Sequence, residues 1–254
     1  KRGSKQVSGN IGKKLPHVIL SQNEILAMFD AISAVSLSDV SDENQEQRHV
    51  VLYDFMRPDR FTMDNIRTIR MISETFAHRI TESISTRLEV MASVNVISVD
   101  QITYNEFIRS VPAETAFAEI GFTGLPGSAV LELDPQVALA ISDLRMGASL
   151  RECGRRTSFT NIDMSVLTAE FSGYTGFLDE ALSSFPHGRS YLKRFVKDAG
   201  SIFVCPSGDL VVLVTFVFRI AEMEKIMNLC LPYRTIEPIT GKLTVDHLLS
   251  SDHY

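Results

Sequence analysis

Apolar residues recur at helical spacing along the stretch Phe61–Leu88. They fall at every third or fourth position, at Ile66, Ile69, Ile72, Phe76, Ile80 and Ile84. This period of about 3.6 residues predicts one long amphipathic helix with a single buried face. The next segment, Glu89–Val99, is rich in valine and isoleucine and predicts a strand.

Shorter elements follow in the first half of the chain. A turn at Thr123–Gly127, which contains glycine and proline, separates two strand-like runs. Asp134-Pro135 has the form of a helix start, with aspartate as cap and proline at the first helical position. The expected elements are, in order, a helix at Tyr104–Ser110, strands at Ala116–Phe122 and Ser128–Leu133, and a helix from Asp134 to about Met146.

The second half repeats this order of elements. It predicts a helix capped by Asp163 and ending near Ser184, strands at Tyr191–Lys197, Ile202–Cys205, Leu210–Ala221 and Lys225–Leu231, and a short helix after Pro232. Each half is a long helix, then strands, then a short helix. The sequence therefore predicts an α/β (α+β) domain over residues 51–245, with pseudo-two-fold symmetry and long helices covering a largely antiparallel sheet.

The first fifty residues have a different pattern. Residues 1–19 are mostly polar and basic and predict a disordered arm. Residues 20–32 predict a short helix, because Ser21 and Glu24 fit a capping box and Ile25, Met28, Phe29 and Ile32 share one face. Residues 33–50 predict a flexible linker. Such a helix either docks on its own domain or folds on a partner.

Composition and charge narrow the class of protein. The 254 residues are 44% hydrophobic, which is enough for one real core, and the net charge of −6 argues against a nucleic-acid binder. The most apolar run, Leu210–Ile220, is about half the length of a membrane span. The three cysteines, Cys153, Cys205 and Cys230, lie far apart, which favours reduced thiols in the cytoplasm. Because the chain begins with Lys1, an incomplete N-terminus is expected.

No catalytic or metal-binding motif stands out in the sequence. None of the six histidines has a partner at ligand spacing on one helix, and no phosphate-binding glycine loop or nucleophile elbow occurs. We therefore expect a binding protein without cofactor or metal.

Four separate segments carry a resemblance to a known family. They are Leu20–Ile25 (LSQNEI), Tyr104–Pro112 (YNEFIRSVP), Leu131–Pro135 (LELDP) and Asn228–Tyr233 (NLCLPY), the last followed by Ile236–Ile239 (IEPI) and Lys242-Leu243. Their order and spacing resemble the flagellar motor switch protein family FliM.

The resemblance implies a set of roles and partners. The N-terminal peptide would bind the phosphorylated response regulator CheY through Ser21, Gln22, Glu24, Ile25, Met28 and Phe29. The middle domain would have the fold of the CheC and CheX phosphatases and would contact the rotor protein FliG and neighbouring copies of itself in a ring. Residues 246–254 would begin the linker to a FliN-like domain, with FliN as a further partner. The location would be cytoplasmic, at the flagellar basal body and peripheral to the inner membrane.

Two segments depart from the family pattern. Leu26 replaces an acidic residue of the CheY-binding motif. The glycine loop that the family uses to contact FliG keeps only its first glycine here. The FliG-binding candidates that the resemblance implies are Gly147, Ala148, Ser149, Leu150 and Arg151. From the residues alone, Gly147 is expected to end the preceding helix in a left-handed conformation.

An enzyme is the alternative interpretation. CheC-like phosphatases use a helical E-x-x-N motif whose amide orients the attacking water. The matching positions here are Glu74–Ala77 and Glu170–Gly173, and both lack the amide. We therefore expect a non-enzymatic protein.

Overall fold

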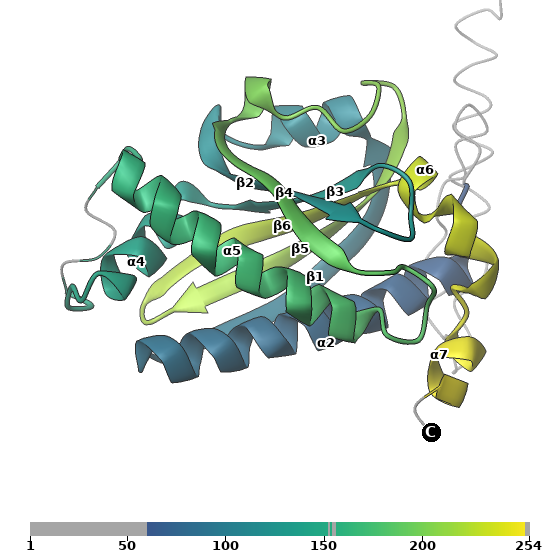
Figure 1. Cartoon of the computed structure of the whole chain (residues 1–254), viewed down its shortest axis with the longest axis horizontal. Helices are drawn as coiled ribbons and strands as arrows, with labels where there is room; N and C mark the ends of the chain where they lie inside the picture. Colours follow the sequence, from purple (N-terminus) through teal and green to yellow (C-terminus); the bar gives the residue numbers. More distant parts are fainter. Residues whose placement is uncertain (1–59, 152, 154–155, 252–254) are drawn as a thin grey trace, which may run out of the picture. The chain divides into compact units, whose positions relative to one another are not determined.

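The computed structural model describes residues 60–151, 153 and 156–251. Within them, helices pack on both faces of one six-stranded antiparallel sheet (Figure 1). The strands are β1 (Ala92–Thr103), β2 (Glu114–Phe122), β3 (Ser128–Leu133), β4 (Ser190–Asp198), β5 (Leu210–Ile220) and β6 (Met223–Pro232).

The strand order is β1-β5-β6-β3-β2-β4, which has pseudo-two-fold symmetry. The first strand of each half adds to the hairpin of the other half: β1 pairs with β5, and β4 pairs with β2. The last strands, β3 and β6, meet at the centre. The predicted fold, a symmetric α/β domain with an antiparallel sheet, is confirmed.

The helices begin and end where local sequence signals place them. Thr62 and Asn65 form a capping box at the start of the long helix α2, and Pro135 opens α4 behind its cap, Asp134. The helices are α2 (Met63–Leu88), α3 (Tyr104–Ser110), α4 (Pro135–Arg145), α5 (Asn161–Ala181), α6 (Tyr233–Ile236) and α7 (Val245–Ser251), with 3-10 turns at Ala199–Ser201 and Glu237–Lys242.

Two apolar clusters occupy the two faces of the sheet. The larger lies beneath α2, α4 and α5 and includes Phe76, Phe171 and Phe216. The smaller lies beneath α3 and includes Phe107 and Phe117. Because alternate residues of the central strands serve both clusters, β3 is buried on both faces along its whole length.

Three expectations about local structure were wrong. Ile202–Cys205 forms no strand; Ile202 and Cys205 instead pack into the smaller cluster. Glu89 is not in a strand, because it ends α2 in the left-handed region, with φ 53°. Thr160, not Asp163, is the N-cap of α5, and Asp163 takes the third helical position of the same capping box. Residues 246–254 were expected to begin a linker; those of them that the structure describes belong to α7, and the linker itself stays a prediction.

Replacing Gly176 with alanine should raise the free energy of unfolding by about 0.5–1 kcal/mol. Gly176 lies inside α5, is exposed, and has open space where a Cβ would stand. Alanine therefore gains helix propensity without a clash. Urea unfolding measures the change, and a loss of stability would contradict the assigned helical environment.

Candidate functional site

The segment Gly147–Arg151 follows α4 directly and is fixed at its start by the helix cap. Gly147 has φ +90°, as the sequence predicted. Its N–H donates to the Leu144 carbonyl at 3.0 Å, and the Ala148 N–H donates to the Asp143 carbonyl at 2.9 Å. These two bonds form a Schellman motif, which satisfies the last carbonyls of the helix. The segment therefore leaves α4 in a defined direction.

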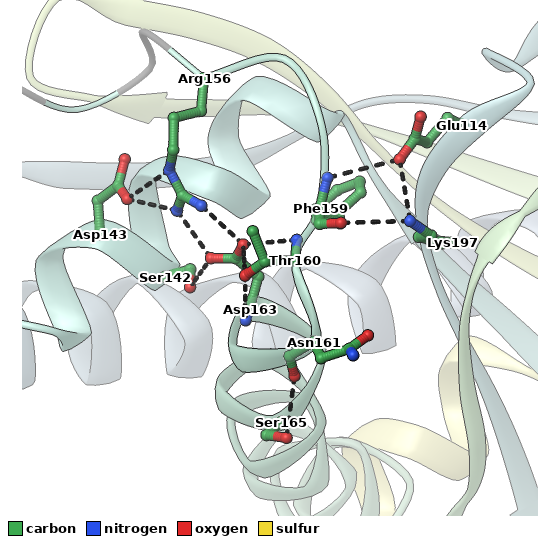
Figure 2. A network of polar contacts seen from close by, with 10 residues as sticks. All are labelled: Glu114, Ser142, Asp143, Arg156, Phe159, Thr160, Asn161, Asp163, Ser165 and Lys197. Atoms are coloured by element: carbon green, nitrogen blue, oxygen red, sulfur yellow. Dashed lines mark hydrogen bonds and ion pairs between the residues drawn. The ribbon is translucent and has the colours of Figure 1, made fainter.

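Arg156 ties the connection between α4 and α5 to both helices (Figure 2). Its Nε lies 3.0 Å from an oxygen of Asp143 in α4. Its Nη1 and Nη2 each lie 2.7 Å from an oxygen of Asp163 in α5. One guanidinium thus bridges two carboxylates on different helices, the planar geometry for which arginine is suited.

The carboxylate of Asp163 is completely buried and fully hydrogen-bonded. Ser142 donates to one oxygen at 2.6 Å, and the Thr160 N–H and hydroxyl donate to the other at 2.8 and 2.6 Å. The Arg156 guanidinium, supported by these donors, holds the pKa of Asp163 well below its usual range. The ion pair therefore persists at neutral pH, and its contribution to stability is lost only as pH falls through that lowered pKa.

The five candidate residues are at least partly exposed, and Leu150 and Arg151 line a groove. The groove has a volume of ≈500 Å³ and lies between this segment, α4 and the turn that joins β5 to β6. Its lining residues are Ala140, Leu144, Leu150, Arg151, Cys153, Ile220, Ala221, Glu222 and Met223. We call it the α4–turn groove.

Residues 62–248 match the family model described as "Flagellar motor switch protein FliM". The chain belongs to the FliM family. It is 37% identical to the flagellar motor switch protein FliM of Treponema pallidum, over 92% of this chain and 68% of that protein. It is 36% identical to FliM of Borreliella burgdorferi, over 89% of this chain and 66% of that protein. The chain thus spans about two thirds of the length of these relatives.

A solved structure has the same fold as this FliM-family domain. It is the crystal structure of the FliG–FliM complex from H. pylori, in which a chain that is 23% identical superposes with a TM-score of 0.66. The match covers 71% of this chain and all of that chain. At this identity the likeness shows the fold alone.

The residues predicted to bind CheY lie outside the part of the chain that the structure describes. They are Ser21, Gln22, Glu24, Ile25, Met28 and Phe29. No signal in the sequence pairs Arg156 with Asp143. Only the Thr160-x-x-Asp163 spacing, a capping box, could have drawn attention to Asp163.

The two positions that match a phosphatase motif, Ala77 and Gly173, carry no side-chain amide. Ala77 is buried within α2. Gly173 lies beside Arg87, whose Nη1 is 3.8 Å from the place where a Cβ would stand. Glu170 is buried and sits 3.5 Å from both Arg87 and Arg145, so it ties three helices together.

The described residues contain no group of three or more metal-ligating side chains that could hold an ion. In the same part of the chain, no helix is long and apolar enough to cross a membrane.

Proposed function

We propose that this chain is a non-enzymatic part of the flagellar motor switch. Residues 20–32 bind phosphorylated CheY, and the segment Gly147–Arg151 passes the signal to FliG to change the direction of rotation. The observation that carries the proposal is the match of residues 62–248 to the FliM family. The H. pylori FliG–FliM complex supports FliG as a partner. Family membership also supports FliN and neighbouring copies in a ring as partners, at the cytoplasmic side of the basal body.

The exposed segment suits a contact with FliG for a physical reason. Its start is fixed by the helix cap, and Arg156 ties a later part of the same α4–α5 connection to both helices, so less conformational entropy has to be lost on binding than in an untethered loop. Leu150 offers an apolar side chain that is 45% exposed, and Arg151 beside it offers a charge.

Gly147→Val, or the pair Leu150→Asp with Arg151→Glu, should abolish FliG binding while the domain stays folded. Valine is strained at φ +90°, so the segment leaves α4 in another direction. The double change puts acid into the contact. Co-purification with FliG, with circular dichroism as the test of folding, measures the result.

Gly208→Val is the matched control for the glycine change. Gly208 lies in the turn before β5, with open space around it and no left-handed backbone. This variant should bind FliG normally. If Gly147→Val and the double variant are folded and also bind normally, FliG contacts another part of the domain.

Phe29→Ala should weaken binding of activated CheY by about 2 kcal/mol, the scale of a hot-spot side chain. Phe29 and Ile25 are expected on one helical face, which suits an apolar groove on the partner. A peptide of residues 15–35 titrated against activated CheY measures the affinity. Asp30→Ala, on the polar side of the predicted helix, is the control. Equal affinities for Phe29→Ala and the unchanged peptide would reject this assignment.

A further inference from the structure

The α4–turn groove has two sides that come from distant parts of the chain. α4 and the segment after it supply Leu144 and Leu150. The β5–β6 turn supplies Ile220 and Met223. The volume of ≈500 Å³ is within the range of ligand pockets, about 300–1,000 Å³, so the groove can admit a side chain of a docked protein.

The turn on the second side holds a strained residue. Ala221 has φ 50°, and it is one of two non-glycine residues with positive φ in the described chain. Its N–H donates to the Met91 carbonyl at 3.0 Å, and Ile220 pairs with Met223 beside it. A non-glycine residue in this region costs roughly 1–2 kcal/mol and persists only where its surroundings impose it. Ala221 and Glu222 form the two-residue turn of the β5–β6 hairpin, whose favoured turn types need positive φ at the first position, so the hairpin fixes the shape of this side of the groove.

The groove is also continuous with the segment proposed to meet FliG, because Leu150 and Arg151 line it directly. A protein bound to those two side chains therefore lies at the groove, with the β5–β6 turn on the opposite side. The lining is mainly apolar, and the two charged lining residues, Arg151 and Glu222, have opposite signs. This combination suits an apolar side chain flanked by polar groups, the composition of a typical interface core and rim.

We infer that the β5–β6 turn is the second half of the FliG-binding surface, and that the groove receives an apolar side chain of FliG. The inference rests on the proposed function, since it takes FliG as the partner. It adds Ala221 and Met223 to the contact.

The unmodified protein offers a direct test through its cysteines. The chain has three, and Cys205 and Cys230 are buried, whereas Cys153 is partly exposed and lines the groove. N-ethylmaleimide should therefore label Cys153 first. Saturating FliG should slow that labelling several-fold, as measured by mass spectrometry of the labelled peptide.

A matched pair of variants tests the turn itself. Met223→Glu places a charge in the groove and should weaken FliG binding about 30-fold, the effect of losing a hot-spot contact of about 2 kcal/mol. Ile226→Glu, on the same strand, is the control: Ile226 is an exposed apolar residue outside the groove lining. It should bind FliG normally. If Met223→Glu does not fold, Met223→Ala, which removes the same side chain without placing a charge in the groove, tests the turn in its place.

The outcomes separate the inference from the proposed function. Loss of binding in Met223→Glu and in the Leu150/Arg151 double variant, with Cys153 protected, supports both. If the double variant loses binding while Met223→Glu binds normally, the inference is wrong and the proposed function stands, even where Cys153 is protected, because FliG on Leu150 and Arg151 alone would cover that thiol. If the double variant binds normally, both the proposed FliG contact and the inference are overturned.

Discussion

Replacing Arg156 with alanine should lower the free energy of unfolding by about 3–5 kcal/mol, because it leaves the buried carboxylate of Asp163 without its counter-ion. Asp163 is completely buried, whereas the Arg156 side chain is 35% exposed, so the lower end of this range is expected. The change also removes the tether between the α4–α5 connection and both helices, so FliG binding should weaken in the variant that remains folded. Urea unfolding should be followed by circular dichroism, since the chain has no tryptophan.

Two further variants isolate the cause of that loss. Arg156→Lys keeps the charge but cannot bridge two carboxylates with a planar group. The free energy of unfolding of this variant should therefore lie between those of the wild type and Arg156→Ala. Arg219→Ala removes an exposed ion pair with Glu224 and should cost no more than about 1 kcal/mol. Equal effects of Arg156→Ala and Arg219→Ala would mean that the bridge between α4 and α5 contributes no more than a surface pair.

Glu132→Gln should make the protein more stable at pH 8 but change little at pH 5. Glu132 lies on the central strand β3, where burial raises the pKa of its carboxyl to about 7, although hydrogen bonds from Thr115 and Asn228 oppose the rise. A raised pKa means that folding favours the protonated form. The wild-type protein therefore loses stability as pH rises from the unfolded value of 4.5 through about 7. The full cost above that range is at most about 3.5 kcal/mol, from about 1.4 kcal/mol per unit of pKa.

Glu119→Gln should change the free energy of unfolding in the opposite direction. Glu119 is as buried as Glu132, and burial alone would raise its pKa. Hydrogen bonds from Lys193 and Arg194 outweigh burial and hold the pKa of Glu119 below its usual value. Its stabilising effect is present at neutral pH and is lost in acid, so Glu119→Gln should be destabilising at pH 7. Unfolding in urea from pH 5 to pH 8 measures both variants. If the free energy of unfolding of the wild-type protein rises from pH 5 to pH 8, and Glu132→Gln leaves that dependence unchanged, the raised pKa assigned to Glu132 is wrong.

Periodicity and capping signals predicted most of the fold because they are local. The 3.6-residue period marked α2, and Gly147 marked the end of α4. The strand predicted at Ile202–Cys205 was wrong, because the apolar residues that suggested it pack beneath α3 without pairing in the sheet. Arg156 could not be found by such signals: its two partners lie on different helices, and only the three-dimensional structure brings them together. The same holds for the α4–turn groove, whose sides are some 70 residues apart in the chain.

The order of the strands makes each half of the chain dependent on the other. A half on its own has one complete hairpin, β2–β3 or β5–β6, and a first strand whose partner belongs to the other half. An isolated hairpin is at best marginally stable in water. Neither half is therefore an independent folding unit, and the sheet must assemble from contacts between residues more than a hundred positions apart, such as Thr103 with Leu210. A chain cut between α4 and α5 would yield two fragments that reach a native state only as a complex.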